Sequence, residues 1–429
     1  MDFTECYADT VSSAAAAARS GCRRQVRRLI ESGCSLDARD NRGWNALHEA
    51  AAAGSKGCVQ CGDYVNSLTH EGESACYLAA QRGHLSVVRL LLKAHANINQ
   101  LTNDLSCPLY AVDNGHQDVV KLLVSRGAEV DRTHTASCWT CLHQAVYKQG
   151  HSDIVHILVN VCNLEAHDDH KISPLFVAAQ YGQRECLQIL INAGACVNTQ
   201  AADLATPLLI ASQEGHQACV DLLLDHGADP NMACSHEWPQ LPVHAAAEFG
   251  HLILRRLIDV TNRTCDRSGG MVSPLYVAIH SHQTGSIQLL LEEGYSPDAQ
   301  DCTLRELVCV ALSHVSFASC WLPVLLRAGL DPSLLLHPHL ETADSDVLNS
   351  LLQFVNWSTL SPALKLILER RRAEKTWDPC TDFSVPRLSH ICRLKIREVL
   401  GPDLLMRTNV VQQLPVPSLL HDFLKFRDI

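Results

Sequence analysis

A helix–turn–helix unit, best preserved between Ser173 and Asn198, constrains this chain more than any other feature. Ser173 suits the N-cap of a helix, and Pro174 suits the first helical position, where its missing N–H costs nothing. Gly182 ends this short helix, and Gly194 ends the apolar helix that follows. Neither helix is long enough to be stable alone in water. The unit therefore needs neighbours that cover its faces, and the pattern should recur along the chain.

The unit does recur over the first 300 residues. The small residue inside the first helix of each unit is, in order, Ala17, Ala50, Ala79, Ala111, Ala145, Ala178, Ala211, Ala246 and Ala278. Successive units are 29 to 35 residues apart, and their first helices open with segments such as NALHEAA, TCLHQAV and TPLLIAS. This period and this opening resemble ankyrin repeats, in which stacked helix pairs bury one continuous core. We therefore expect an all-α ankyrin-repeat solenoid of about nine repeats with short hairpin loops over residues 1–300.

Two parts of the chain depart from this pattern. The second repeat starts regularly, but Ser55 to Ser74 is interrupted by glycines and has no apolar stripe, which predicts a broken or shortened outer helix. After Gly294 the repeat decays, and residues 301–382 are interpreted as a degenerate repeat and connecting helices. Within them, an amphipathic helix is predicted from Asp344 to Trp357, and Ser361-Pro362 opens another.

Charge and hydropathy exclude several classes of partner. The formal net charge is −11 with 19% charged residues, so a nucleic-acid backbone is an unfavourable partner. No apolar run approaches the length of a membrane span, so no membrane insertion is expected. The opening MDFTECYADT is acidic and polar, unlike a secretory or mitochondrial leader. We expect an intracellular protein of the cytoplasm, with the nucleus as an additional compartment.

The twenty cysteines are spread evenly along the chain, which favours reduced thiols that act as small hydrophobic residues. Two pairs have CxxC spacing, Cys58/Cys61 and Cys138/Cys141, but neither has a second pair at zinc-finger spacing. The repeat pattern already explains the position of Cys141. We expect no metal and no cofactor.

Signatures of catalysis are also missing from the sequence. It has no GxSxG elbow, P-loop or HExxH motif, and no Cys–His pair stands outside the repeats. The histidines in the fourth position of the repeat opening are therefore interpreted as hydrogen-bonding groups of the repeats: His48, His143 and His244.

The C-terminal segment carries two further motifs. Leu388, Cys392 and Ile396 are spaced i, i+4 and i+8, which places them on one helix face. Downstream, LPVP begins at Leu414, where the prolines force extended backbone, and a short apolar helix is predicted after it. One interpretation is a pair of capping helices that closes the repeat stack.

A second interpretation rests on resemblance. The two motifs, in this order and after ankyrin repeats, resemble a SOCS box, and the chain is identified as a member of the ankyrin repeat and SOCS box family. We assign the SOCS box to residues 383–427. The resemblance implies an elongin C-binding helix with Leu388, Ile391, Cys392 and Ile396. It also implies a segment that binds cullin-five, with Leu414, Pro415, Val416, Pro417, Leu420 and Phe423.

The family resemblance implies a non-catalytic function. Such a chain would be the substrate-recognition subunit of an elongin B/C–cullin–RING ubiquitin ligase, with cullin-five and its RING subunit as partners and an unknown protein as substrate. The alternative is an ankyrin adaptor or sequestering protein that binds a partner without ligase assembly. Three tryptophans near hairpin tips are candidates for substrate binding, because tryptophan is enriched at binding hot spots. The alternative is that each packs on the loop of its own repeat: Trp44, Trp139 and Trp238.

Overall fold

The computed structural model describes most of the repeat region and part of the remainder. The described residues are 12–60, 65–102, 105–133, 138–148, 151–235, 239–262, 272–295, 315–336, 343–355, 357, 360–377, 392, 394–396 and 399. The chain divides into two compact units: Met1–Ala202 with Asp221–Ala228, and Asp203–Val220 with Asp229–Ile429.

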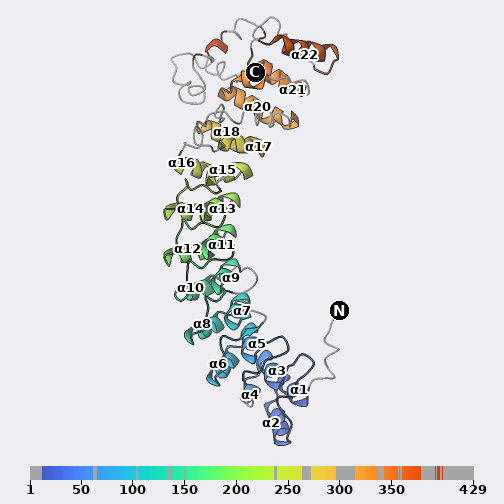
Figure 1. The fold of residues 1–429 in the computed structure, drawn as a ribbon, viewed down its shortest axis with the longest axis vertical. Helices are drawn as coiled ribbons and strands as arrows, with labels where there is room; N and C mark the ends of the chain where they lie inside the picture. Colours follow the sequence, from blue (N-terminus) through green and yellow to red (C-terminus); the bar gives the residue numbers. More distant parts are fainter. Residues whose placement is uncertain are drawn as a thin grey trace. The chain divides into compact units, whose positions relative to one another are not determined.

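The first unit is a stack of helix pairs with an inner and an outer row (Figure 1). The inner helices are α1 (Ser13–Arg19), α3 (Ala46–Ala52), α5 (Ala75–Gln81), α7 (Cys107–Asp113), α9 (Cys141–Tyr147) and α11 (Pro174–Gln180). The outer helices are α2 (Arg23–Glu31), α4 (Lys56–Val59), α6 (Leu85–Lys93), α8 (Gln117–Ser125), α10 (Ser152–Leu158) and α12 (Arg184–Asn192). Consecutive helices of each row pack against one another, as in an ankyrin stack. A two-residue antiparallel ladder joins β1 (Leu101–Thr102) to β2 (Leu105–Ser106) in one hairpin.

The α11–α12 pair shows why these residues form this unit. The Ser173 hydroxyl accepts a hydrogen bond from the backbone N–H of Phe176 at 3.2 Å, and Pro174 takes the first helical position. Gly182 has a φ of 66°, which ends α11 in the left-handed conformation that glycine adopts without steric cost. Ala178 and Leu190 are fully buried, so the small inner residue and the outer apolar stripe supply the core.

The predicted defect in the second repeat is confirmed. Its outer helix α4 has four residues, whereas α6, α8 and α12 have nine each. Only Cys58 and Val59 of α4 are buried. The inner helix α3 therefore packs against a shorter described outer helix than its neighbours do.

The second unit continues with more helix pairs and then longer helices. Its elements are α13 (Pro207–Gln213), α15 (Pro242–Phe249), α16 (Leu254–Val260), α17 (Pro274–His280), α18 (Thr284–Glu292), α20 (Val315–Ala328), the 3-10 turn η3 (Pro332–Leu335), α21 (Ser345–Leu352) and α22 (Pro362–Ala373); α14 (Gln217–Asp225) has residues in both units. No helix in the described part of the chain has the length and hydropathy to cross a membrane.

The two helices predicted near the end of the described region form, with one correction. The helix predicted from Asp344 to Trp357 is α21, which ends at Leu352. Val355 lies beyond the end of this helix and is also buried. The apolar stripe of the sequence therefore extends past the helix, into the turn that follows it. The predicted start of α22 is confirmed, since the Ser361 hydroxyl accepts from the backbone N–H of Leu364 at 3.3 Å.

Candidate protein-binding surfaces

The histidines of the repeat openings join successive repeats, as the sequence predicts. Nε2 of His48 lies 3.0 Å from the carbonyl oxygen of Ser67, and Nε2 of His143 lies 3.1 Å from that of Ile172. In each case the carbonyl belongs to the hairpin that leads into the next inner helix. Burial lowers the pKa of both imidazoles, so they are neutral donors at neutral pH. These histidines therefore set the spacing of the hairpins along the stack.

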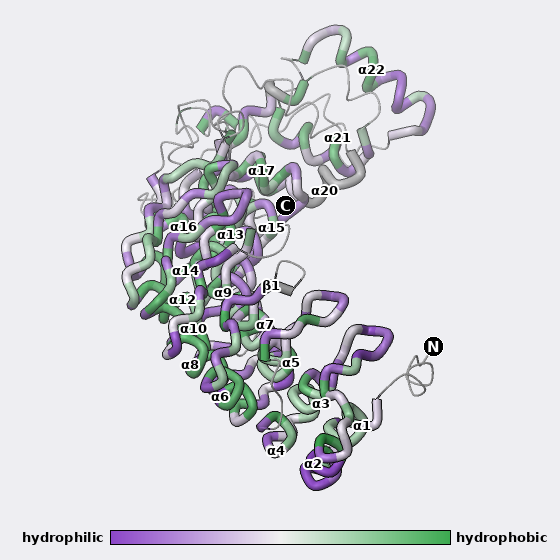
Figure 2. The backbone as a smooth tube through the Cα atoms, turned by 60° about the horizontal axis from the view of Figure 1, so that its bottom comes forward, coloured by the Kyte–Doolittle hydropathy of each residue, from purple (hydrophilic) through white to green (hydrophobic). Residues whose placement is uncertain are grey.

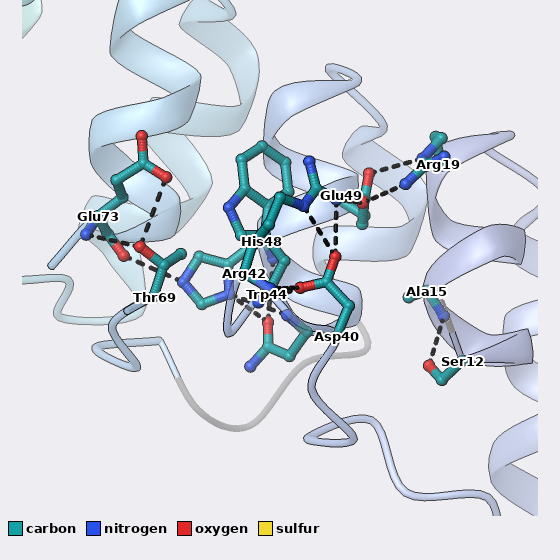
Figure 3. A network of polar contacts seen from close by, with 11 residues as sticks. Ser12, Ala15, Arg19, Asp40, Arg42, Trp44, His48, Glu49, Thr69 and Glu73 are labelled. Carbon is teal, nitrogen blue, oxygen red and sulfur yellow. Dashed lines mark hydrogen bonds and ion pairs between the residues drawn. The ribbon is translucent and has the colours of Figure 1, made fainter. Parts of the chain in front are cut away.

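Trp44 lies on such a hairpin, within a polar network (Figure 3). Its ring is half-buried, and the Arg42 guanidinium carbon lies 4.2 Å from the ring centroid, in cation–π geometry. Its backbone N–H donates to the Asp40 carboxylate at 2.8 Å. The carboxyl group of Glu73, on the next repeat, belongs to the same part of the network, and burial raises its pKa. Trp44 is thus held by Asp40 and Arg42 of its own hairpin, and the Arg42 guanidinium covers one face of its ring.

The same network extends to the first repeat through Glu49 on α3. This buried carboxylate accepts from Arg19 Nε at 2.8 Å and from Arg42 Nη2 at 2.9 Å. Arg42 in turn donates to Asp40 at 2.7 Å. The hydrogen bonds to Glu49 raise the pKa of the Arg19 guanidinium. The network links α1, α3 and the hairpin before α3, at the end of the stack where the outer helix α4 is short.

Trp139 belongs to a different arrangement, which we call the aromatic row (Trp139, Tyr147 and Tyr181). Its indole N–H donates to Asp168 at 3.3 Å, and its ring stacks on His143 with centroids 6.1 Å apart. The ring also meets Tyr147 edge-on at 5.4 Å, and Tyr147 meets Tyr181 edge-on at 4.9 Å. These are favourable geometries for aromatic pairs.

The aromatic row is accessible to a partner. Tyr147 and Tyr181 are 39% and 44% exposed, and they lie at the C-terminal ends of α9 and α11. An ion pair flanks them, with Lys148 Nζ 3.0 Å from Asp113. Adjacent aromatic side chains with a polar edge are typical of protein-binding hot spots. Trp139 is therefore part of a larger exposed surface, while Trp238 lies outside the described residues.

Sequence reasoning did not find the two tyrosines of this row. They fall at the ends of inner helices, where the repeat pattern does not specify the residue type. The two tyrosines are 34 residues apart, which is the length of one repeat. Because successive repeats stack, residues at equivalent positions lie side by side, and this spacing would have identified the pair.

The cysteine pairs with CxxC spacing do not form a cluster of ligands in the described part of the chain. Cys141 is buried in α9, and burial raises the pKa of its thiol to about 12, so it is a protonated core residue. No group of three or more His, Cys, Asp and Glu side chains among the described residues could hold a metal ion. Cys61 lies outside those residues.

Little of the C-terminal motif region is described. Leu388, Ile391 and every predicted cullin-binding residue from Leu414 to Phe423 lie outside the described residues. Cys392 and Ile396 are helical and exposed, as is Val399, which the sequence prediction did not include.

Three described residues of this segment form an apolar stripe (Cys392, Ile396 and Val399) at the i, i+4 and i+7 spacing of one helix face. Ile396 and Val399 are 42% and 75% exposed. The stripe is thus open to a partner in the isolated chain.

Comparison with known proteins identifies both regions. Models of ankyrin repeats (3 copies) match residues 59–134 and 142–234, and a model of ankyrin repeats (many copies) matches residues 14–61. The SOCS box model matches residues 384–425. Ankyrin repeat and SOCS box protein 3 of Homo sapiens is 39% identical over 504 aligned residues, which cover 100% of this chain and 97% of the relative. The chain belongs to the ankyrin repeat and SOCS box family.

The chain is also similar to two further relatives and to one solved structure. The protein of the same name from Bos taurus is 38% identical over 505 aligned residues, covering 100% of this chain and 96% of the relative. A putative E3 ubiquitin-protein ligase of Arabidopsis thaliana, XBAT31, is 29% identical over 32% of this chain and 36% of its own. Among solved structures, the ankyrin repeat domain of human ASB11 has a TM-score of 0.45 and 24% identity, covering 51% of this chain and 99% of that one.

Proposed function

We propose that this chain is the substrate-recognition subunit of an elongin B/C–cullin–RING ubiquitin ligase. The ankyrin repeats would hold a target protein, and the SOCS box would bind elongin B/C and cullin-five with its RING subunit. The observation that carries the proposal is the SOCS box match at residues 384–425, which follows the ankyrin repeats in the chain. In this role the chain positions a substrate and performs no chemical step itself.

The exposed stripe supports the elongin part of the proposal. An unpartnered apolar helix face is a hydrophobic surface that a groove on another protein can cover. Leu388 lies four residues before Cys392 in the sequence, so on a helix it would extend the stripe by about one turn. We expect Leu388 to be the main anchor and Cys392 to be the small residue that allows close approach.

The elongin test uses the full chain and co-purification with elongin B/C. Leu388→Ala should cost about 2–4 kcal/mol, or roughly a 30- to 1000-fold loss of affinity. Leu366→Ala is the matched control, because Leu366 is an exposed leucine on α22, outside the stripe. If a Leu388→Ala/Cys392→Ala variant recovers as much elongin B/C as the wild type, the ligase proposal fails. The alternative of an ankyrin adaptor without ligase assembly would then remain.

The cullin test uses the reconstituted elongin complex. Replacing Leu414 and Pro415 with alanine removes apolar contact and preorganised extended backbone, so cullin-five binding should weaken while elongin C binding stays unchanged. Phe423→Tyr should strengthen cullin binding at most about tenfold, the value of one hydrogen bond. Unaltered cullin recruitment by the Leu414/Pro415 variant would remove this half of the proposal.

The aromatic row is the proposed substrate surface. Tyr147→Ala/Tyr181→Ala should reduce the set of proteins that the full chain captures, as measured by pull-down and mass spectrometry, with elongin B/C recovery as an internal reference. Phe249→Ala removes an exposed aromatic ring outside the row and serves as the control. An identical set of captured proteins from the double variant and the wild type would exclude the row as the substrate surface.

A further inference from the structure

The outer helix of the first repeat has an unusual side-chain composition. α2 reads RRQVRRLIE, and its four arginines, Arg23, Arg24, Arg27 and Arg28, are all exposed. Only Val26 of this helix is buried. Figure 2 shows α2 as a strongly hydrophilic segment at the N-terminal end of the stack. This helix thus contributes little to the core and presents four positive charges to solvent.

None of these four charges forms an ion pair among the described residues, although Glu31 lies on the same helix. No described ion pair or hydrogen bond involves any of the four guanidinium groups. Arg23 and Arg27 are separated by four positions, as are Arg24 and Arg28, so each pair is a like-charge i, i+4 pair that destabilises the helix. Arg28 lies in the last turn, where it complements the helix dipole, but folding gives no such reason for the other three arginines.

The neighbouring outer helices extend the same charge. Lys56 of α4, and Arg89 and Lys93 of α6, are exposed basic residues on helices that pack successively beside α2. Glu31 is the one acidic residue in the three helices α2, α4 and α6. We define the basic outer face as these seven side chains: Arg23, Arg24, Arg27, Arg28, Lys56, Arg89 and Lys93. It contrasts with the net charge of −11 for the whole chain.

We propose that the basic outer face binds an acidic segment of a partner protein. Guanidinium groups bind carboxylates through paired hydrogen bonds, and α2 offers four of them. Residues four positions apart on a helix are separated by about 6 Å along its axis. Alternate side chains of an extended peptide are separated by about 6.5–7 Å. An extended segment with a carboxylate at every second position therefore matches the arginine rows.

The size of the face and the charge of the chain favour a short acidic segment over a long polyanion. Screening limits attraction to roughly 8 Å at physiological salt, so only groups that touch the face gain from it. A nucleic acid would place many more phosphates near a chain whose net charge repels them. The basic outer face shares no residue with the aromatic row or with the SOCS box, and the proposal does not depend on ligase assembly.

The test measures binding of a fluorescent peptide of about twelve residues, with glutamate at every second position and serine between, to the full chain. Replacing the four arginines of α2 with glutamine should lower the affinity by about tenfold or more and flatten its salt dependence. The charge-matched control replaces four exposed basic residues elsewhere, and it should lose less than about threefold: Lys121, Arg126, Arg184 and Arg372.

Folding and competing ligands are checked in the same experiment. The glutamine variant should melt at the wild-type temperature or above it, because it loses two repulsive i, i+4 pairs. Absence of peptide binding by the wild-type chain, or equal losses in both variants, would overturn the proposal. So would arginine-dependent binding that is tighter for single-stranded DNA or for phosphatidylserine vesicles than for the peptide, which would assign the face to a nucleic acid or a membrane.

Discussion

Nε2 of His244 lies 2.8 Å from the carbonyl oxygen of Val272, so one imidazole joins the first turn of α15 to the segment that leads into α17. The backbone N–H of Leu241 donates to the other ring nitrogen at 2.9 Å. This pair of bonds requires the neutral ring with its proton on Nε2. Burial lowers the pKa of His244 from 6.5 to about 4, because no water solvates the charged form.

The first prediction concerns pH. Because the folded-state pKa is depressed, the unfolded chain binds more protons between pH 6.5 and pH 4, and stability is complete above that window. As pH falls through it, this histidine should remove roughly 3 kcal/mol from the opening free energy of α15. Hydrogen exchange of α15 amides, corrected for intrinsic rates, measures this loss. His244→Gln should open more easily at pH 7 and lose less on acidification; an equal loss would contradict the assignment.

The second prediction uses two glycines with the same backbone conformation. Gly83 and Gly127 have φ values of 75° and 77°, but a Cβ at Gly83 would lie 2.6 Å from Nδ1 of His116, while one at Gly127 would meet nothing within 4 Å. Gly127→Ala should cost about 1 kcal/mol from backbone strain alone. Gly83→Ala should cost about a further 1 kcal/mol or more, because His116 must move away from the Gln81 carbonyl that it contacts at 2.9 Å. Urea denaturation compares the two, and equal costs would show that the ring moves freely.

Sequence reasoning was sufficient to predict the helix pairs of the stack. The repeat openings and the helix-ending glycines predict the helix pairs of the stack, because both signals act within a few residues of the positions they specify. The predicted C-terminal end of α21 was wrong, because the prediction followed the apolar stripe of the sequence. An apolar stripe reports burial, and Val355 is buried although the helix has already ended. The aromatic row was not predictable from either signal, because contact between Tyr147 and Tyr181 depends on how two repeats stack.

The third prediction concerns the carboxylate of Glu49. Glu49→Gln keeps the shape of the side chain but removes the carboxylate that Arg19 and Arg42 share, so that Arg42 keeps only Asp40 as a buried counter-charge and Arg19 loses its ion pair. The expected cost is about 1–2 kcal/mol, less than for a fully buried pair because both arginines reach solvent. The control is Glu129→Gln, whose partner Arg132 is 3.7 Å away with both side chains about half exposed; it should change stability by less than about 0.5 kcal/mol. Equal effects in thermal unfolding would show that the network adds nothing beyond a surface pair.

The fourth prediction concerns the short helix α4. Repeats are coupled to their nearest neighbours, so the region with the least outer-row cover should open at the lowest free energy. Hydrogen exchange should therefore be faster in α3 than in α11, although both inner helices have seven residues. Equal protection in the two helices would mean that the Glu49 network offsets the missing outer turns.

The spacing of the histidine bridges also bears on how fast the chain folds. His48, His143 and His244 each reach a carbonyl between 19 and 29 residues ahead. Contacts of such short sequence separation give a low contact order, and closing a short loop costs little entropy. Folding can then begin at any well-formed repeat and spread in both directions. A repeat released from a ribosome could therefore fold as soon as its neighbour emerges, before the SOCS box has been synthesised.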